Sequence, residues 1–257
     1  MIARRRPDAS GSYGGLAGFS RIATDGWELH LKRDFVDHAG EITVALENWR
    51  RGGETGLGNR GGGFRLNLDG MPELFVRHCR RGGLVGAAMG DVFIGLRRRP
   101  LNELSVADQA FKRGIAVAEP IGALVAWIAP ALYRGFFITR AMAGIPLWDF
   151  LRTDDDPVVR RHVLEQARMA IDTMHDRGLY HADLNLHNLL VSERDENFSV
   201  IILDLDKARI IDRPVPSTLR RRNSARLIRS ARKLESVGGL LDEDDLTLLA
   251  GGRPGHS

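Results

Sequence analysis

The sequence predicts an α+β fold with two lobes: a small lobe with an antiparallel β-sheet plus one helix, and a larger, mainly helical lobe. Runs of β-branched and aromatic residues gather within residues 64–139, where they predict strands. Over residues 157–177, apolar side chains recur with the period of an amphipathic helix. Between these regions, the sequence of residues 142–146 breaks both patterns, as a hinge between lobes would.

The composition is that of a soluble globular protein long enough for two lobes with cores of their own. The chain has 257 residues, of which 43% are hydrophobic and 27% are charged. Its net charge of +4 and isoelectric point near 9.6 favour anionic partners such as a nucleotide, a phosphorylated lipid or a membrane surface. A solvated basic surface is the alternative, and no nucleic-acid partner is expected. Cys79 is the only cysteine, so no internal disulfide can form.

The sequence predicts no membrane-spanning segment. The most apolar stretch, residues 114–138, is interrupted by charged residues and prolines, whereas a span needs about 20 mostly apolar residues. The Arg-rich residues 1–7 are not followed by the apolar core of a signal peptide. Any membrane contact is therefore expected to be peripheral.

Local periodicity and the positions of glycine and proline predict the individual elements. Strands are expected at residues 64–68, 74–76, 121–128, 135–139, 189–191 and 200–203. Helices are expected at residues 102–113, 147–151, 157–177 and 219–234. The acidic run at residues 242–245 and the Gly-rich end that follows are expected to form a tail, whose end is disordered.

One loop carries most of the candidate chemistry. From His181 it reads His-Ala-Asp-Leu-Asn-Leu-His-Asn, and the strand after the next turn ends in Leu-Asp-Leu-Asp-Lys. An Asp that meets an acceptor hydroxyl, an Asn five residues later and a further Asp are the layout of a phosphoryl-transfer site of the protein-kinase type. We therefore predict a protein-kinase-like fold, in which Asp183 is the catalytic base. Asn188 and Asp204 would bind Mg²⁺, which prefers oxygen ligands.

Two further residues near this loop are predicted to support it. A histidine at the position of His181 more often braces a loop by hydrogen bonds than takes part in the chemistry. Asp206 is compatible with a second metal contact, a structural acid or a salt bridge to Lys207. The apolar run before Asp204 predicts that this residue is buried, where a carboxylate needs a partner.

Two features of the small lobe are candidates for nucleotide binding. Gly61, Gly62 and Gly63 end a glycine-dense stretch, and glycine lets backbone N–H groups approach phosphate oxygens closely. A plain flexible hairpin is the alternative there. Glu103 lies near the start of a predicted helix. It would pair with the cation that holds the nucleotide phosphates, unless it is only an acid favoured in a first helical turn.

Four stretches resemble the lipopolysaccharide kinases, which are relatives of the protein kinases. The loop motif with Leu-Asp-Leu-Asp-Lys specifies only the superfamily. Residues 75–86, 116–120 and 223–233 are similar to segments of the 3-deoxy-D-manno-octulosonic acid (Kdo) kinases. These segments read Arg-His-Tyr-x-Arg-Gly-Gly, Leu-Pro-Val-Pro-x-Pro and Asn-Leu-x-Arg-Leu-x-Arg-Ser-Leu-x-Lys. Together the stretches cover roughly residues 40–235.

The resemblance implies an ATP-dependent and Mg²⁺-dependent kinase of lipopolysaccharide core assembly. Its acceptor would be the 4-hydroxyl of Kdo on a Kdo–lipid A precursor, at the cytoplasmic face of the inner membrane of a Gram-negative bacterium. Asp183 maps to the base, Asn188 and Asp204 to the metal ligands, and Glu103 to the helix carboxylate of the small lobe. Arg77 stands where the phosphate-pairing lysine is usual, and an arginine fork can also pair with phosphate.

Other positions depart from protein kinases. Asn185 stands where protein kinases carry a lysine after the base, which argues against peptide Ser/Thr specificity. Asp206 stands where protein kinases place glycine, and the lipopolysaccharide kinases share this departure. Cys79 replaces the tyrosine of the Arg-His-Tyr segment.

The basic helix predicted at residues 219–234 is where an acceptor or an anionic leaflet would bind. Arg222, Arg226 and Arg229 are the candidates, because arginine forks suit the carboxylates and phosphates of Kdo–lipid A. A basic face also favours an anionic membrane surface. The alternative is a solvated face of a helix that packs through Leu227 and Ile228.

Together these features predict four regions. Residues 1–40 would be an N-terminal extension with the first strand or strands, and residues 41–141 the small nucleotide-binding lobe. Residues 142–240 would be the helical catalytic lobe, and residues 241–257 an acidic, then Gly-rich tail. Two other functions stay open: a kinase of the same fold acting on another sugar or on protein Ser, Thr or Tyr, and a nucleotide-binding pseudokinase scaffold.

Overall fold

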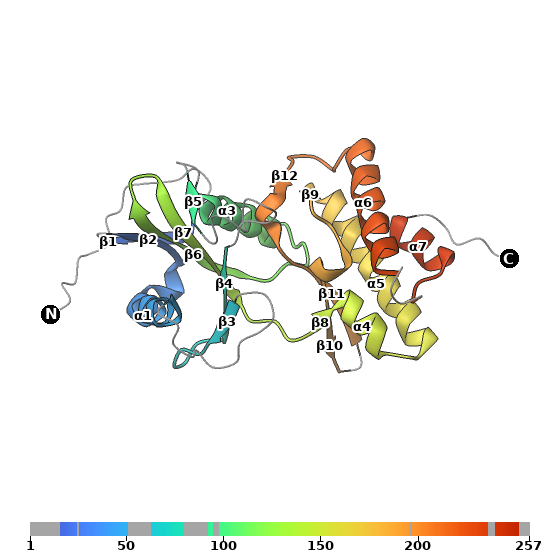
Figure 1. Cartoon of the computed structure of the whole chain (residues 1–257), viewed down its shortest axis with the longest axis horizontal. Helices are drawn as coiled ribbons and strands as arrows, with labels where there is room; N and C mark the ends of the chain where they lie inside the picture. The colour runs from blue at the N-terminus through green and yellow to red at the C-terminus, as the bar shows by residue number, and fades with distance from the viewer. Residues whose placement is uncertain are drawn as a thin grey trace. The chain divides into compact units, whose positions relative to one another are not determined.

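The computed structural model describes residues 16–24, 26–50, 63–79, 92–94, 98–195, 197–235 and 240–251. The chain forms two compact units, and each is described by itself. The first unit takes Met1–Asp108 and Glu119–Ala141, and the second takes Gln109–Ala118 and Met142–Ser257. Figure 1 shows the elements of both units in chain order.

The first unit is built on one antiparallel sheet. Within the described residues its strands are β1 (Phe19–Thr24), β2 (Trp27–Lys32), β3 (Gly63–Leu66), β4 (Leu74–His78), β5 (Phe93–Ile94), β6 (Pro120–Ala129) and β7 (Leu132–Arg140). They run in the order β1-β2-β6-β7-β4-β3, and β5 pairs with β7. The strands predicted at residues 64–68, 74–76, 121–128 and 135–139 are β3, β4, β6 and β7, so the apolar runs were correctly assigned to strands.

One face of this sheet is covered by a helix that the sequence analysis did not expect. The helix is α1 (Ala39–Arg50), which follows the 3₁₀ helix η1 (Arg33–His38). Ile42 and Leu46 of α1 are buried in one cluster with Leu124 and Phe136 of the sheet. The small lobe therefore holds α1 in addition to its one predicted helix. The apolar Val44 is 57% exposed and does not lie on the buried face of α1. It therefore weakens the amphipathic pattern of this stretch, and the buried face is recognised only from its packing on the sheet.

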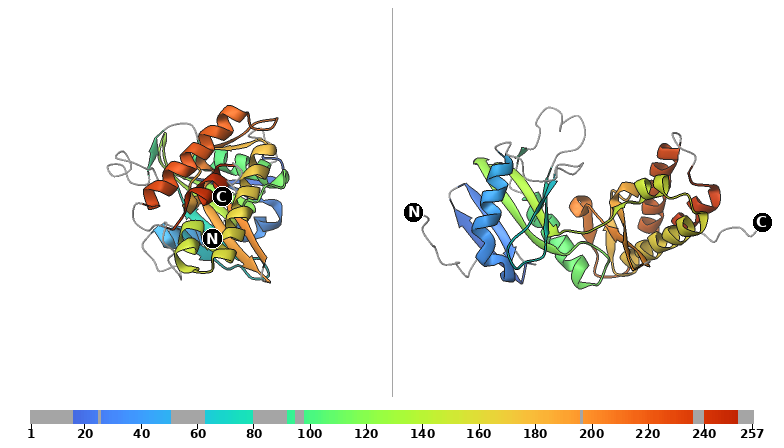
Figure 2. Two further views of the ribbon diagram at one scale, coloured as in Figure 1. Left: turned by 90° about the vertical axis from the view of Figure 1, so that its right-hand side faces the viewer. Right: turned by 90° about the horizontal axis from the view of Figure 1, so that it is seen from below.

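The predicted small-lobe helix, α3 (Arg99–Lys112), lies against the other face of the sheet. Neighbouring strand residues point to opposite faces. Because Phe136 belongs to the α1 cluster, Phe137 and its cross-strand partner Arg77 point away from α1. There Arg77 reaches Glu103 of α3. The first unit is thus a sheet between two helices. The right-hand view of Figure 2 shows the blue helix α1 lying across the strands.

The second unit is mainly helical. Its described helices are α4 (Leu147–Thr153), α5 (Pro157–Asp176), α6 (Ser217–Glu235) and α7 (Glu243–Ala250), with the 3₁₀ helices η2 (Leu186–Asn188) and η3 (Leu205–Lys207). Its strands are β8 (Ile145–Pro146), β9 (Leu179–His181), β10 (Leu189–Arg194), β11 (Asn197–Ile202) and β12 (Ala208–Ile210). They form two small sheets, β11-β10-β8 and β12-β9. All helices and strands predicted for this region are present, with ends that differ by a few residues.

Helix α5 leads into the candidate catalytic loop. The Asp156 carboxylate caps its start by accepting hydrogen bonds from the N–H groups of Val158 and Val159, and Pro157 occupies the first turn. The helix stops before Gly178, whose φ of +83° favours glycine. One buried stripe faces the core, as predicted from the helical period: Val163, Leu164, Ala167, Ile171 and Met174.

The acidic run at residues 242–245 begins helix α7 and is not part of a tail, which corrects the prediction. Asp242 accepts a hydrogen bond from the N–H of Asp245 at 2.8 Å, and the Asp245 carboxylate accepts one from the N–H of Asp242 at 3.4 Å. This capping box satisfies two N–H groups of the first turn. Leu246 and Leu249 are buried, and the helix packs on α5 and α6. The Gly-rich end lies largely outside the described residues.

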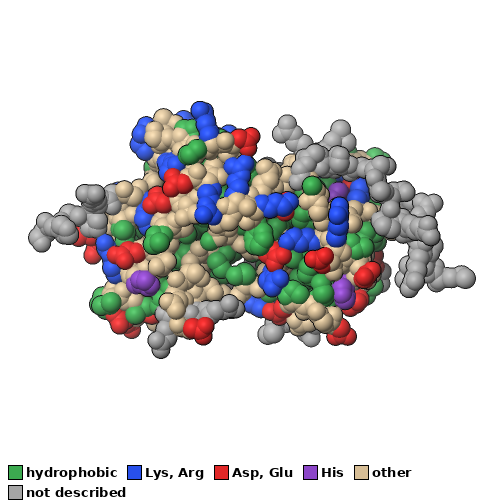
Figure 3. Space-filling view, turned by 180° about the vertical axis from the view of Figure 1, so that it is seen from behind, with side chains coloured by type: hydrophobic (Ala, Val, Ile, Leu, Met, Phe, Trp, Pro, Cys, Tyr) green, Lys and Arg blue, Asp and Glu red, His purple; other side chains and the backbone are tan. Residues whose placement is uncertain are grey.

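Among the described helices, none combines the length and the apolar character needed to cross a bilayer. Figure 3 shows one face of the molecule, on which Lys and Arg side chains are interspersed with Asp and Glu.

Candidate active site

The predicted catalytic loop lies in the second unit between β9 and β10. His181 ends β9, and Leu189 begins β10 directly after η2. Asp183 and Asn188 are half-buried within this loop. The Asn188 side chain donates through Nδ2 to the backbone oxygen of Asp183 at 2.9 Å. Asn185 donates to the same oxygen at 2.9 Å, so two amides hold the backbone of Asp183 in place.

The end of β11 places Asp204 beside this loop. The N–H of Leu203 donates to the backbone oxygen of Asn188 at 2.9 Å, which extends the β10–β11 pairing by one step. Asp204 comes next, with φ of +57° and ψ of +69°, a left-handed conformation that Asp tolerates better than most residues. Asp204 is exposed, so the expectation of a buried carboxylate is wrong. The strand ends at Ile202, and the left-handed turn takes the side chain out of the core.

His181 is fully buried and braces the loop. Its Nε2–H donates to the backbone oxygen of Leu203 at 3.0 Å, while its Nδ1 accepts from the N–H of Asp183 at 3.2 Å. These two bonds require a neutral ring with the proton on Nε2. Burial lowers the pKa of His181 and keeps the ring neutral. The ring thus ties both sides of the site together, and its one N–H proton is engaged in the hydrogen bond to Leu203.

A buried contact from α6 also supports the loop, and the sequence analysis did not predict it. Asn223 of α6 donates through Nδ2 to the backbone oxygen of His181 at 2.7 Å. Its Oδ1 accepts from Nε2 of His175, at the end of α5, at 3.0 Å. Asn223 and His175 are both buried. One signal could have pointed to Asn223: it stands four residues before Leu227 and eight before Ala231, on the buried stripe of its helix.

Two cations reach the carboxylate of Asp183. Lys207 Nζ lies 2.9 Å from Oδ2, and an Arg226 guanidinium nitrogen contacts Oδ1. Partial burial alone would raise the pKa of Asp183. The hydrogen bonds and charges of Lys207 and Arg226 outweigh this effect, and they hold the pKa below its usual range. Asp183 is therefore ionised at neutral pH and can accept a hydrogen bond from an acceptor hydroxyl.

The remaining predicted residues of this unit lie near the loop or on α6. Asp206 is half-buried, and the neighbouring Lys207 forms an ion pair with Asp183. Arg222, Arg226 and Arg229 are all exposed on α6. Arg226 also forms an ion pair with Asp183, which the sequence analysis did not predict.

In the first unit, Arg77 of β4 forms an ion pair with Glu103 of α3. The Glu103 side chain is 1% exposed and that of Arg77 is 25% exposed. Gly63 lies opposite Arg77 in the β3–β4 pair. A Cβ at position 63 would meet the Phe75 ring at 2.6 Å and the Val76 oxygen at 2.7 Å, so packing by itself requires glycine there.

Two of the predicted small-lobe features lie outside the described residues. Gly61 and Gly62, the first two glycines of the candidate phosphate loop, belong to the undescribed residues 51–62. Residues 80–86, the second half of the Arg-His-Tyr-like segment, lie in the undescribed residues 80–91.

The donor set around Asp183 fits a hard cation. The Nδ2 group of Asn188 is used in the loop, which leaves its amide oxygen for another partner. Asp204 adds an exposed carboxylate, and all of these donors are oxygen atoms, as Mg²⁺ prefers. In the described part of the chain, no group of three or more His, Cys, Asp and Glu side chains could hold a metal by itself. A kinase-type site needs fewer protein ligands, because nucleotide phosphates complete the coordination.

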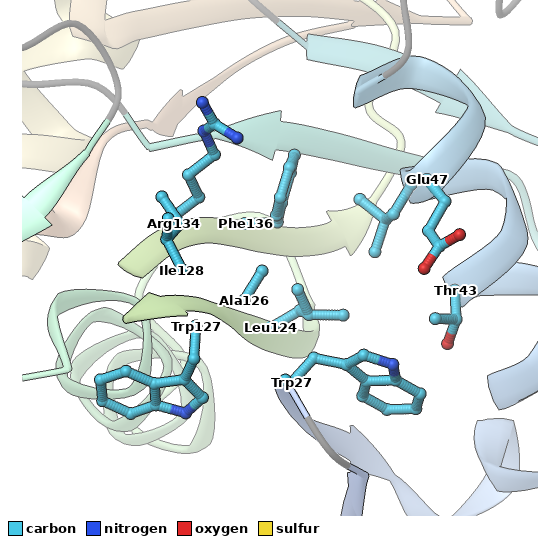
Figure 4. A pocket seen from close by; sticks show the side chains of 11 residues that line it. Trp27, Thr43, Glu47, Leu124, Ala126, Trp127, Ile128, Arg134 and Phe136 are labelled. Atoms are coloured by element: carbon cyan, nitrogen blue, oxygen red, sulfur yellow. The ribbon is translucent and has the colours of Figure 1, made fainter. Parts of the chain in front are cut away.

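A hollow in the first unit lies between α1 and the sheet (Figure 4). It has a volume of about 230 Å³ and is lined by Trp27, Glu47, Arg134 and Phe136, among others. Because Phe136 faces α1 and Arg77 faces α3, the hollow is on the other side of the sheet. We therefore do not count it in the candidate site.

The braced loop with Asp183, Asn188 and Asp204 fits a kinase of the protein-kinase-like class. The sequence model of the lipopolysaccharide kinase (Kdo/WaaP) family matches residues 46–245. The chain belongs to this family. The family predicted from the sequence is thereby confirmed, and the solved structure described next confirms the protein-kinase-like α+β fold.

Curated relatives and a solved structure agree with this assignment. A protein named 3-deoxy-D-manno-octulosonic acid kinase from Photobacterium damsela subsp. piscicida is 26% identical over 209 residues, which cover 80% of this chain and 84% of the relative. A protein of the same name from Vibrio parahaemolyticus is 29% identical over 177 residues, which cover 68% and 70%. The solved structure of WaaP in complex with acyl carrier protein aligns with a TM-score of 0.56 at 20% identity and 86% coverage of both chains, which supports the fold.

Proposed function

We propose that this kinase transfers the γ-phosphate of ATP to the 4-hydroxyl of Kdo on a Kdo–lipid A precursor, in lipopolysaccharide core biosynthesis. The observation that carries the proposal is the braced loop, which presents an ionised Asp183 beside the oxygen donors of Asn188 and Asp204. Membership of the lipopolysaccharide kinase family and the name shared by the relatives support the choice of acceptor.

In this proposal Asp183 orients the acceptor hydroxyl and takes its proton late in the transfer. Its lowered pKa makes it a weak base but a reliable hydrogen-bond acceptor, which suits a reaction that depends more on positioning than on proton abstraction. Lys207, which contacts the Asp183 carboxylate, would place positive charge near the phosphoryl group as negative charge develops on it during transfer. His181, Asn185 and Asn188 keep the Asp183 backbone from moving while this happens.

Asn188 and Asp204 would hold Mg²⁺, and Asp206 would support them. When bound, the ion supplies charge neutralisation on the nucleotide phosphates. The contribution of this chain is a pair of oxygen donors at the adjoining ends of β10 and β11, fixed by the hydrogen bond between Leu203 and Asn188.

In the first unit, Arg77 would bind the nucleotide phosphates, and Glu103 would orient its guanidinium. A forked guanidinium can contact a carboxylate and a phosphate at the same time. The ion pair between Arg77 and Glu103 supports this role. Gly61, Gly62 and Gly63 stay candidates for the loop over the phosphates, although packing already accounts for glycine at position 63.

We also propose that the enzyme works as a peripheral protein at the cytoplasmic face of the inner membrane. The acceptor is a lipid, and the exposed Arg222, Arg226 and Arg229 of α6 carry charge suited to its anionic groups or to an anionic leaflet.

Mass spectrometry of a Kdo–lipid A precursor after incubation with the protein, ATP and Mg²⁺ tests the proposal. We expect one added phosphate, located on the Kdo ring by fragmentation. The protein carrying Asp183→Asn serves as the control and should leave the acceptor unchanged. Phosphate found only on a soluble sugar or a peptide would favour the alternative of a kinase for another acceptor, and no transfer at all would favour the pseudokinase.

A further inference from the structure

A basic hollow lies beside the candidate active site in the second unit. It has a volume of about 460 Å³ and lies between the catalytic loop and α6. The loop contributes Asn185 and His187, and α6 contributes Arg226, Arg229, Ser230, Lys233 and the apolar Leu234. The apolar helix stripe of Leu227 and Ala231 is buried on the other side of α6, so the helix presents this polar face to the hollow.

The lining suits an anion. Three of the lining residues are cations, and among the described residues that line the hollow none is acidic. The hydroxyl of Ser230 and the amide of Asn185 add neutral hydrogen-bonding groups. Guanidinium groups bind a carboxylate through two parallel N–H bonds, which gives both affinity and orientation.

The hollow is tied to the proposed base by one side chain. Arg226 lines the hollow and contacts the Asp183 carboxylate. Asn185 also does both: it lines the hollow, and its Nδ2 donates to the Asp183 backbone at 2.9 Å. An anion in the hollow would thus lie about one guanidinium width from the place where the acceptor hydroxyl must sit.

We propose that this hollow binds the carboxylate of the acceptor's own acidic sugar ring and thereby selects the hydroxyl that reaches Asp183. The inference rests on the proposed function and deepens it. In Kdo, the carboxylate and the 4-hydroxyl are attached to the same ring, separated by one ring carbon between their own. That span matches a hollow adjoining the base. The phosphates of lipid A are at least one sugar further away and fit the more distant arginines of α6 better.

Arg229 is the residue that tests the hollow most cleanly. It lines the hollow, and its side chain is exposed, so substitution spares the core. Arg226 is less suitable because its loss also changes Asp183 directly. Arg221, an exposed arginine on the same helix that does not line the hollow, provides the matched control.

The experiment compares three acceptors: Kdo–lipid A precursor, the same molecule with its Kdo carboxylate as a methyl ester, and the same molecule without its lipid A phosphates. For the parent enzyme we expect the ester to raise the acceptor KM about tenfold, because the ester loses one charge-assisted hydrogen-bond pair with the hollow. For Arg229→Gln we expect a similar rise with the unmodified acceptor and little further effect of the ester. The kcat and the KM for ATP should change less than about twofold.

Two variants guard the interpretation. Arg229→Lys keeps the charge and should recover part of the lost affinity. Arg221→Gln should behave as the parent with all three acceptors. Should Arg229→Gln unfold early in a thermal scan, the acid-versus-ester comparison on the parent enzyme decides by itself.

The inference is overturned if the parent enzyme treats acid and ester alike, or if Arg229→Gln loses the same factor with both. It is also overturned if removal of the lipid phosphates, and not esterification, erases the difference between parent and Arg229→Gln, because the hollow would then bind phosphate. The absence of transfer to all three acceptors would instead overturn the proposed function, and the inference with it.

Discussion

The Asp183 loop of the second unit and the Arg77–Glu103 pair of the first hold a carboxylate in two different ways. Asp183 is half-buried and meets two cations that are themselves 45% and 58% exposed. Its backbone is fixed separately by neutral groups, His181, Asn185 and Asn188. Glu103 is almost completely buried, and its ion-pair partner comes from the sheet on which its helix packs.

The difference separates chemistry from stability. At Asp183 the neutral bonds hold the loop, so the carboxylate can be removed without loss of the fold. At Glu103 the charge is inside the unit, and removing its partner leaves a buried charge with less compensation. We therefore expect substitutions at Asp183 to affect turnover and substitutions at Arg77 to affect the free energy of unfolding as well.

The largest effect is expected for Asp183→Ala. Phosphate transfer should fall by at least about a hundredfold, because the acceptor hydroxyl loses its orienting group. ATP affinity and the unfolding midpoint should stay close to those of the parent enzyme, since the proposed role of Asp183 does not include holding the nucleotide. Initial rates, nucleotide titration and urea unfolding measure the three quantities. Unchanged turnover would remove Asp183 from its proposed role.

Asn188→Ala and Asp204→Ala sharpen the same comparison through the metal. Each variant should require at least about tenfold more Mg²⁺ for half-maximal activity, because each would remove one of the two proposed oxygen ligands. Asp155→Ala removes an exposed acid of the same unit and is the control. A Mg²⁺ titration with the parent's midpoint would contradict a metal role for the residue concerned.

Arg77→Leu tests the buried pair. It should reduce the free energy of unfolding by about 3 kcal/mol, the lower end for breaking a buried pair, because the Arg77 side chain is 25% exposed. Arg77→Leu with Glu103→Gln should recover part of this loss, since the buried charge is then gone. Urea unfolding monitored by tryptophan fluorescence gives the values. A double variant no more stable than Arg77→Leu would show that the pair is not the reason.

Asn223→Ala should reduce the free energy of unfolding by about 2 kcal/mol. It leaves the His181 carbonyl and the His175 ring nitrogen without their partner in the core. Ser224→Ala, one residue further along α6, should change stability by less than about 0.5 kcal/mol. Equal effects of the two substitutions in urea unfolding would mean that the buried contact does not hold the loop.

The smallest effect is a shift in the titration of Asp183. Because Lys207 and Arg226 lower its pKa, the stability that this carboxylate contributes is present above its ordinary value of 3.8 and is lost as the pH falls through the lowered folded value. Lys207→Ala should raise the pKa of Asp183, so that protonation begins at higher pH. Carboxyl ¹³C NMR follows the titration directly. Arg209 stacks on the Tyr180 ring and serves as the control. Arg209→Ala should leave the pKa of Asp183 unchanged.

Local pattern predicted most of the elements. The period of α5, the alternation in β3 and β4, and the turn between β10 and β11 depend on neighbours in the chain, so each could be assigned from its own stretch. Helix α1 could not be assigned in this way, because the exposed Val44 interrupts its amphipathic pattern. Its buried face is defined only by packing on the sheet. Helix α7 was taken for a tail because its caps are acids, which also occur in disordered ends.

The sequence by itself determined the family, the loop motif and the residue types that can bind a metal and a hydroxyl, because all of these are carried by short continuous stretches. Only the tertiary structure decided which cations meet Asp183. Lys207 and Arg226 stand 24 and 43 residues away in the chain. Their approach depends on how η3 and α6 pack beside the loop, and the hydrogen bond from Asn223 to the His181 carbonyl ties α6 to the loop. Such contacts follow from the burial of a helix face, which no local pattern specifies.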